Sequence, residues 1–464
     1  MSTFFENTKK FIEDAVRIAY IPGDILGRLE KPDKVLEFEI AVGDNPVRDP
    51  MPMASADAEG RLVSNGARKF QAWRVQHNNI LGPYKGGIRY HPDSNLDEVK
   101  ALASLMTLKT SLAGILFGGA KGAVRVDPRK LSLQELEELS RMYVRAIWQE
   151  IGPEKDVPAP DVGTTPQIMD WMTDEYSKLI GKLSPAAQQS GASLAQNGRA
   201  GFTGKSIEKG GSRGRDIATG FGGYVILREF LNLSSKFLVL SSESQLVVAI
   251  QGFGNVGANI AKILYEKGFK IVAISDSKGA LYEEDGIDIK KVLDVKEKTG
   301  IIDRNKCYAV SEERLASGTP CREFTNDDLL QMPVDILIPA ALENVINEAN
   351  AEKIRAKVIL EMANGPVTPE AEKIFTKRGI EVLPDILANS GGVVGSYFEW
   401  VQNRKGEQWS EEEVLAKIDE KLTEAFQSVQ KIKEECNVSW RMASYVRAIK
   451  RVAEGNKNPP FGAV

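Results

Sequence analysis

The spacing of hydrophobic and polar side chains changes along the chain, and each spacing predicts a type of element. Residues 35–42, VLEFEIAV, alternate apolar with acidic side chains, which is typical of a half-buried strand. A second strand is predicted over 69–78, KFQAWRVQHN, and the turn-rich residues between the two predict a strand pair with a long loop. The glycines and prolines of 81–92, LGPYKGGIRYHP, predict an irregular loop.

Apolar residues three and four positions apart predict helices. The segment SNLDEVKALASLMTLKTSLAGI is expected to begin with Ser94 or Asn95 as its N-cap, and its spacing places Lys109 on an otherwise apolar face. Another helix is predicted in SLQELEELSRMYVRAIWQEI, and the proline-rich EKDVPAPDVGTTP after it predicts extended, irregular backbone. The Ser-, Gln- and Gly-rich residues 184–214 are typical of a connection between domains.

The second half of the chain alternates strand and helix patterns. Residues 246–276 begin with the apolar run LVVAI and continue as turn, helix and strand, which predicts a βαβ unit. Two more apolar runs, in VDILIPA and KVILEMA, each end in a loop of small residues, glycine or proline. A parallel sheet with a ligand along its carboxyl edge is therefore expected, followed by helices beginning near residues 391, 410 and 440.

Composition limits the classes of function. At 464 residues the chain exceeds what one core organises, so two domains are expected, and its net charge of -4 provides no broad attraction for nucleic acid or a membrane. Three cysteines without metal-ligand spacing indicate a reducing compartment, and we expect a cytoplasmic protein. No segment predicts a signal peptide or a membrane span. With two histidines in the chain no metal site is predicted, so lysine and carboxylate must carry any acid–base chemistry.

A glycine motif indicates a dinucleotide site. Gly252, Gly254 and Gly257 in GFGNVG directly follow an apolar run and directly precede a helical pattern, which is the context that makes the motif informative. Asp276 ends the next strand, where its carboxylate is expected to accept the ribose hydroxyls. A tight turn without ligand is the alternative. The serine and lysine after Asp276 leave the choice between NAD and NADP open.

The first half must supply the chemistry, and its candidates are Lys85, Lys109, Lys121 and Asp161. Lys121, in FGGAKGAVRV, has neighbours too small to bury it by themselves but small enough to admit substrate and cofactor rings against its side chain. Desolvation and nearby cations lower the pKa of a lysine, which makes it a proton shuttle near neutral pH. Converging lysines attract a dicarboxylate, and Asp161 then contacts an ammonium group or carries protons. Solvated lysines and an Asx turn at Asp161 are the alternatives.

Several motifs occur together in a known order: LGPYKGGIRYHPDSNLDEVKALASLMTLKTSLAGILFGGAKGA, GPEKDVPAPDVGT, GGSRGRDIATGFG, QGFGNVG, ANGPVT and ANSGGVVGSYFEW. They closely resemble the Glu/Leu/Phe/Val dehydrogenase superfamily, and within it the glutamate dehydrogenase branch, from about Gln71 through the C-terminal helix. The resemblance implies reversible oxidative deamination of L-glutamate to 2-oxoglutarate and ammonia, with hydride transfer to NAD or NADP. It also implies a cleft that closes between a substrate domain and a nucleotide domain.

The resemblance assigns a role to each candidate. Lys121 would activate water and stabilise the carbinolamine, and Asp161 would shuttle protons to and from the amino nitrogen. Lys109 would hold the α-carboxylate, and Lys85 with Ser396 the side-chain carboxylate. Lys85 would select the substrate, because relatives acting on branched or aromatic amino acids have an apolar residue there. Residues expected around the cofactor are Thr219, Gly252, Gly254, Asn255, Val256, Gly257, Asp276 and Asn364.

The implied fold class is α/β with two domains. We expect an α/β substrate-binding and oligomerisation domain over 1–201, a Rossmann-like NAD(P)-binding domain over 202–438, and a C-terminal helical segment, 439–464, that returns to the first domain. Small-molecule substrates and a homohexamer are expected.

The chain departs from the family pattern in three places. Ala120 replaces the third glycine of GGGKGG, Met106 stands where many members have glutamine, and the segments 44–67 and 188–199 are longer than usual. Two other functions stay open: an amino acid dehydrogenase with a different acidic or polar substrate, and a nucleotide-binding regulatory paralogue with weak catalysis.

Overall fold

The computed structural model describes residues 4–20, 23–43, 68–183, 196, 198–233 and 245–457. The segment 44–67 and most of 188–199, which the sequence marks as long, lie outside the described residues. The elements of the first half are α1 (Phe4–Ala19), α2 (Gly23–Glu30), β1 (Lys34–Val42), β2 (Arg68–Asn78), β3 (Tyr84–His91), α3 (Leu96–Leu112), β4 (Gly119–Arg125), α4 (Leu133–Ile147), β5 (Asp156–Pro160) and α5 (Pro166–Leu183).

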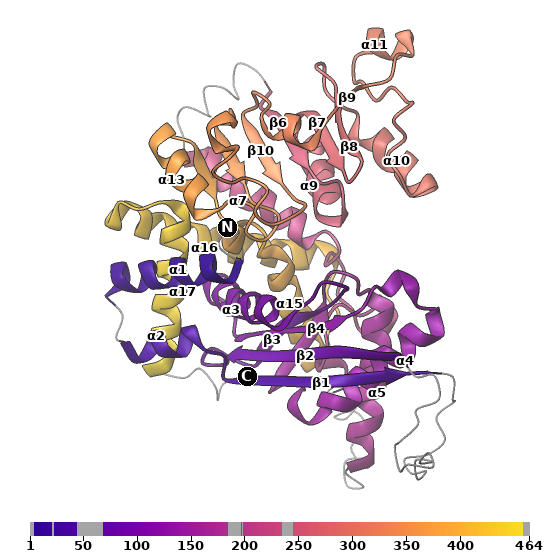
Figure 1. Ribbon diagram of the computed structural model, residues 1–464, viewed down its shortest axis with the longest axis vertical. Coiled ribbons are helices and arrows are strands. Elements are labelled where there is room, and N and C mark those ends of the chain that lie inside the picture. Colours follow the sequence, from indigo (N-terminus) through magenta and orange to yellow (C-terminus); the bar gives the residue numbers. More distant parts are fainter. Residues whose placement is uncertain are drawn as a thin grey trace, which may run out of the picture.

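The second half contains α7 (Ala218–Leu233), β6 (Val247–Gln251), α9 (Asn255–Glu266), β7 (Lys270–Asp276), β8 (Gly279–Tyr282), α10 (Ile289–Thr299), α11 (Glu312–Ser317), β9 (Arg322–Phe324), α12 (Asn326–Leu330), β10 (Ile336–Pro339), β11 (Val358–Leu360), α13 (Pro369–Arg378), β12 (Glu381–Leu383), α14 (Asp385–Ala388), α15 (Gly391–Lys405), α16 (Glu411–Cys436) and α17 (Trp440–Lys457). Figure 1 shows the two halves, each built around its own sheet, with α7, α15 and α16 between them.

The first sheet has the strand order β1-β2-β4-β3-β5 in the described residues. The predicted pair is confirmed: β1 and β2 are antiparallel, with Phe38 opposite Ala72. The predicted helix after them is α3, and Asn95 is its N-cap. Strand β4 runs antiparallel to β2 and parallel to β3, so it lies inside the sheet.

The prediction of an irregular loop over 81–92 is wrong, because residues 84–91 form β3 between β4 and β5. The glycines that suggested a turn are required by a neighbouring strand. A Cβ on Gly86 would lie 1.6 Å from the carbonyl oxygen of Ala120. The proline-rich segment EKDVPAPDVGTTP, predicted as extended and irregular, contains the regular strand β5. This strand pairs with β3 at the edge of the sheet, where prolines are tolerated.

The second sheet has the order β12-β11-β10-β6-β7-β8-β9 in the described residues. Strands β12 to β7 pair in parallel, and the βαβ unit predicted over 246–276 is formed by β6, α9 and β7. Parallel strands bring their carboxyl ends to one edge, which is where a ligand binds in an open α/β sheet. The predicted α/β fold class is confirmed.

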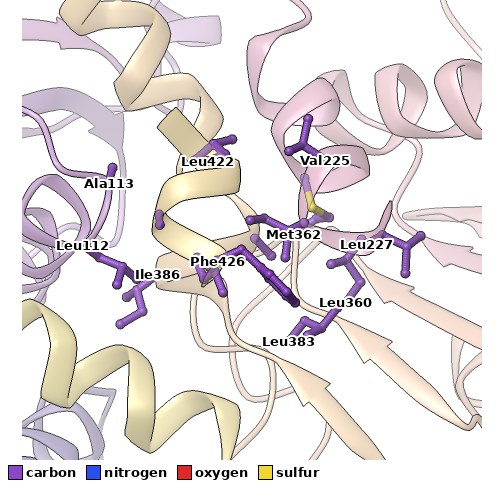
Figure 2. Packing of buried hydrophobic residues seen from close by; sticks show 14 of the residues in the cluster. Leu112, Ala113, Val225, Leu227, Leu360, Met362, Leu383, Ile386, Leu422 and Phe426 are labelled. Atoms are coloured by element: carbon purple, nitrogen blue, oxygen red, sulfur yellow. The ribbon is translucent and has the colours of Figure 1, made fainter. Parts of the chain in front are cut away.

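The last helix, α17, contacts both halves. Oγ of Ser111, in the last turn of α3, donates a hydrogen bond to the carbonyl oxygen of Ala448 (2.7 Å). At the other end of α17, Arg441 pairs with Glu361 and Glu372 of the second half. The core is continuous as well: Figure 2 shows α16 side chains between the end of α3 and the second sheet.

The helix thus returns to the first half, as expected, while the boundaries at 201/202 and 438/439 stay a prediction. Among the described residues, no helix has both the length and the apolar character needed to cross a bilayer.

Candidate active site

The predicted catalytic lysine lies in the middle of β4. Side chains alternate between the two faces of a strand, so Lys121 lies on the same face of β4 as Gly119. This face packs against α3, because a Cβ added to Gly119 would lie 2.2 Å from Thr107 of that helix. Nζ of Lys121 forms an ion pair with Oδ2 of Asp161, the residue that follows β5. Lys121 is 3% exposed. Its sequence neighbours are too small to bury it by themselves, so residues distant in the sequence supply the burial.

The small residues around Lys121 are required by packing within the protein. A Cβ on Gly118 would lie 2.0 Å from the carbonyl oxygen of Asn78, and one on Gly122 would lie 2.4 Å from Oη of Tyr143. These contacts come from β2 and α4, on two sides of β4. We therefore attribute the glycines to the close approach of other elements rather than to room for a ligand.

Ala120 lies next to Lys121, but its methyl group points to the opposite face of β4. We expect Ala120→Gly to leave kcat within about threefold of the wild-type value, because the methyl group does not face the lysine. The free energy of unfolding should fall by about 1 kcal/mol, because glycine costs conformational entropy in a strand. Steady-state kinetics and urea unfolding test both statements, and a large change in kcat with unchanged stability would contradict them.

The pKa values of Lys121 and Asp161 are both lower than usual, but for different reasons. Burial lowers the pKa of Lys121, and the attraction of Asp161 opposes this shift without cancelling it. Burial alone would raise the pKa of Asp161, but Lys121 and Arg89 hold it below its usual range. Lys121 therefore releases a proton more readily than a solvated lysine, while Asp161 stays ionised at neutral pH.

Lys109 reaches from α3 to the second half of the chain. Its Nζ donates a hydrogen bond to Oδ1 of Asn364, in the loop after β11, and Nδ2 of Asn389 donates to the same oxygen at 3.1 Å. Burial lowers the pKa of Lys109 to about 8, with Asp385 opposing the shift and Lys121 adding to it. The face of β4 that carries Lys121 packs against α3, the helix that carries Lys109, and Lys121 acts electrostatically on Lys109. The two lysines therefore belong to one site, at the junction of the two halves.

Lys85 and Ser396 lie near the same arginine, Arg215. Lys85, in β3, is 1% exposed, and its Nζ donates a hydrogen bond to the carbonyl oxygen of Val157 at 3.1 Å. Arg215 donates to Oγ of Ser396 from Nε (3.3 Å) and from Nη2 (3.1 Å). Burial lowers the pKa of Lys85 well below its usual value, and Arg215 adds to this shift. Ser396 therefore contacts Arg215 directly, and Arg215 acts on Lys85 electrostatically while pairing with Glu399 at 3.4 Å.

Asp161 has a second cationic neighbour, Arg89, near the end of β3. Nε of Arg89 donates to Oδ1 of Asp161 at 3.0 Å, and Nη1 of Arg89 pairs with Glu98 in the first turn of α3. Asn95 accepts a hydrogen bond from the backbone N–H of Glu98 at 3.0 Å and so caps this helix. The capped first turn therefore positions Glu98, which in turn holds Arg89 against Asp161.

Removing this arginine should change the acid side of the pH profile. Asp161 faces Lys121 and Arg89 directly, with Lys109 and Glu98 farther away, and the cations keep its pKa low. In Arg89→Gln that pKa rises, so Asp161 becomes protonated at a higher pH. We expect the acid limb of kcat/KM to move upward by about one pH unit.

Arg129→Gln is the matched control, since Arg129 is exposed and pairs with Asp127 away from the site. An acid limb that stays at the wild-type pH in Arg89→Gln would remove Arg89 from this role.

The glycine motif forms the turn between β6 and α9. Gly252 has φ of +92°, and a Cβ on Gly257 would lie 1.8 Å from the carbonyl oxygen of Gly252. A Cβ on Gly254 would meet nothing within 4 Å, and no side chain of the described residues caps α9. Open space before a helix N-terminus suits the pyrophosphate of a dinucleotide, so these residues fit the predicted cofactor.

The other residues predicted to surround the cofactor lie on elements next to this turn. Asn255 and Val256 begin α9, Thr219 is the second residue of α7, and Asp276 is the last residue of β7. Asn364 follows β11, so it lies at the same carboxyl edge of the sheet as Asp276. Their contacts with a cofactor stay a prediction.

Two family descriptions match the chain. Glutamate/Leucine/Phenylalanine/Valine dehydrogenase matches residues 210–459, and the Glu/Leu/Phe/Val dehydrogenase dimerisation domain matches residues 58–178. The chain belongs to the Glu/Leu/Phe/Val dehydrogenase family. The resemblance inferred from its motifs is confirmed.

Relatives in this family match over most of the chain. The NAD-specific glutamate dehydrogenase of Staphylococcus aureus (strain COL) is 44% identical over 408 residues, covering 88% of this chain and 91% of its own. The NADP-specific glutamate dehydrogenase of Synechocystis sp. is 40% identical, covering 97% and 96%. Among solved structures, the hetero-hexameric glutamate dehydrogenase of Thermus thermophilus superposes with a TM-score of 0.80 at 29% identity, covering 99% and 98%.

Two residues of this Glu/Leu/Phe/Val dehydrogenase site were missed from the sequence, Arg89 and Arg215. Arg89 is four positions after Lys85, so a strand pattern would have placed both side chains on one face. Because residues 81–92 were predicted as a loop, the shared face of Lys85 and Arg89 was not recognised. Arg215 lies in the motif GGSRGRDIATGFG, but nothing in the spacing of that motif relates it to Lys85 or Ser396, which lie far from it in the sequence.

Proposed function

We propose that the chain catalyses the reversible oxidative deamination of L-glutamate to 2-oxoglutarate and ammonia, with NAD or NADP as the hydride carrier. The observation that carries the proposal is a pair of buried lysines, Lys85 and Lys109. Among the described residues, neither forms an ion pair with a carboxylate, and their partners are the Val157 carbonyl oxygen and the Asn364 side chain. Buried cations require compensation, and the two carboxylates of glutamate supply it.

The ion pair of Lys121 and Asp161 is suited to the chemistry at the amino group. Asp161, held ionised by its two cationic neighbours, accepts a proton from the substrate ammonium group. Gly252, Gly254 and Gly257 would hold the cofactor, which would supply the acceptor for the hydride of the glutamate Cα, so that the substrate becomes an iminium. Lys121 in its neutral form, which its lowered pKa makes accessible, removes a proton from the water that attacks the iminium carbon, and its ammonium form then stabilises the carbinolamine. Loss of ammonia from the carbinolamine gives 2-oxoglutarate.

The group around Arg215 selects the acidic side chain. Lys85, Arg215 and Ser396 together donate hydrogen bonds and positive charge to the distal carboxylate, while Lys109 binds the α-carboxylate. An apolar substrate would leave the buried Lys85 ammonium group without a carboxylate in contact with it, so that substrate is rejected. Two carboxylate sites at fixed separation hold the Cα in place, and proximity of this kind supplies much of the rate.

We infer that the protein is a cytoplasmic homohexamer. The match to a dimerisation domain over 58–178 and the likeness to a solved hetero-hexamer support assembly into a hexamer. All three cysteines are free, which suits a reducing compartment. Light scattering of the purified protein tests the assembly, and a monomer or a dimer would contradict it.

A spectrophotometric assay at 340 nm tests the activity. It combines 2-oxoglutarate and ammonia with NADH or NADPH in separate runs, and 2-oxoisocaproate replaces 2-oxoglutarate for comparison. We expect oxidation of at least one cofactor with 2-oxoglutarate and much slower oxidation with 2-oxoisocaproate. No turnover with either cofactor would exclude the proposed function, and equal rates with both oxo acids would exclude its specificity.

A further inference from the structure

The acid predicted to bind the adenosine ribose already has a cationic partner. Nη2 of Arg304 donates to Oδ1 of Asp276 at 2.6 Å, and Nη1 of Arg304 donates to Oδ2 at 3.4 Å. The backbone N–H of Lys278 donates to Oδ1 at 2.8 Å. Both oxygens of Asp276 therefore face protein donors, and Arg304 balances the charge that would repel a phosphate.

Arg304 is held in place by several neighbours. Its Nη2 also donates to the carbonyl oxygen of Gly279 at 3.1 Å, and its side chain is 15% exposed against 26% for Asp276. Nε of Arg304 is buried and forms no hydrogen bond with the described residues. It lies 3.5 Å from Oε2 of Glu323, on β9. A guanidinium that is already anchored can bind another anion without first being ordered.

Two lysines add positive charge next to this ion pair. The Lys278 side chain is exposed beside Asp276. Nζ of Lys296 donates a hydrogen bond to the carbonyl oxygen of Phe253, within the glycine turn, and Asp276 acts electrostatically on it. Three cations therefore stand against the two acids Asp276 and Glu323. The edge that receives the adenosine ribose thus has a net positive charge.

We propose that Arg304 is a cofactor-specificity residue that lets this site accept NADP as well as NAD. Asp276 receives the ribose hydroxyls of NAD, as in other dinucleotide sites. When the 2′-position carries a phosphate, Arg304 neutralises Asp276 and binds the phosphate together with Lys278. The inference deepens the proposed function, since it rests on the dinucleotide site proposed above.

Binding of two nicotinamide-free ligands tests the inference without any turnover. ADP-ribose and its 2′-phosphorylated form are titrated into the intact protein at fixed ionic strength, with isothermal calorimetry as the readout. For the wild type we expect the two dissociation constants to agree within about tenfold. Arg304→Gln should weaken binding of the phosphorylated ligand by about 10- to 100-fold and change ADP-ribose binding much less.

Two further variants separate this role from a structural one. Arg304→Lys keeps the charge without the planar fork and should retain part of the affinity for the phosphorylated ligand. Asp276→Asn should weaken binding of ADP-ribose and strengthen binding of the phosphorylated ligand. Arg322→Gln removes the same charge from β9, where Arg322 pairs with Glu284 instead, and should change neither affinity. Thermal unfolding verifies that each variant is folded.

The outcomes distinguish the two proposals. If Arg304→Gln weakens both ligands equally, or if the wild type rejects the 2′-phosphate, Arg304 is not a specificity residue. If both ligands bind as expected but 2-oxoglutarate is not reduced, the proposed function fails while the inference about Arg304 holds.

Discussion

Replacing Lys121 with alanine is expected to lower kcat by about 1,000-fold or more, because the variant loses the group that activates water. The dissociation constant for NADH should stay near its wild-type value, since the glycine turn lies in the other half of the chain. Steady-state kinetics and NADH fluorescence titration measure the two quantities. The ion pair with Asp161 is lost as well, but Arg89 still pairs with that carboxylate and keeps it ionised.

Lys130→Ala is the matched control for this variant, because Lys130 follows β4 and is exposed. It should leave kcat unchanged. A Lys121→Ala protein that binds NADH and retains most of its turnover would remove Lys121 from the catalytic step.

Replacing Lys85 with leucine should lower kcat/KM for 2-oxoglutarate by about 100-fold or more, because the distal carboxylate loses a buried cationic partner. Turnover of 2-oxoisocaproate should fall much less, or rise, because an aliphatic chain then meets an aliphatic side chain. The free energy of unfolding should not fall, since the buried ammonium group has no carboxylate partner among the described residues and its desolvation cost disappears. Parallel kinetics with the two oxo acids and urea unfolding test these statements.

The matched control is Lys205→Met, because Lys205 is also buried in this region but already pairs with Glu399 at 2.7 Å. That variant removes one of the two described cationic partners of the buried Glu399 and leaves Arg215 at 3.4 Å, so it should lower the free energy of unfolding without the same change in oxo acid preference. Equal losses with both oxo acids in Lys85→Leu would contradict the specificity assigned to Lys85.

Elements whose signals are local could be predicted from the sequence. The alternation in β1, the N-cap and apolar spacing of α3, and the strand, glycine turn and helix of the βαβ unit are each contained in one segment. Their residues specify the element before any neighbour is known. The same is true of the glycine turn, because its conformation depends on Gly252 and Gly257 themselves.

Strands β3 and β4 could not be predicted in the same way. Several of their glycines leave room for a neighbouring backbone: a Cβ on Gly86, for example, would collide with the carbonyl oxygen of Ala120. From sequence alone, such glycines cannot be distinguished from those of a turn. The error extended to the site, because the loop predicted over residues 81–92 hid Arg89. The residues that bury Lys121 are distant in the sequence and could not be named from it.

The sequence named several residues of the candidate site, but it named neither its two arginines, Arg89 and Arg215, nor the contacts between its members. Lys85, Lys109, Lys121 and Asp161 came from their chemistry and from the family resemblance, which ordered motifs far apart in the chain. Which of them is paired, and with what, depends on tertiary structure. Only the tertiary structure shows that Lys121 pairs with Asp161. It also shows that, among the described residues, no carboxylate forms an ion pair with Lys85 or Lys109.

The central claim is that hydride passes directly from the Cα of glutamate to the cofactor. The most direct measurement uses L-glutamate labelled with deuterium at Cα, together with NAD or NADP, and analyses the reduced cofactor by mass spectrometry. We predict that the reduced cofactor carries the deuterium and gains one mass unit, and that unlabelled 2-oxoglutarate is released with ammonia. Reduced cofactor without deuterium, or no reduced cofactor at all, would contradict this account.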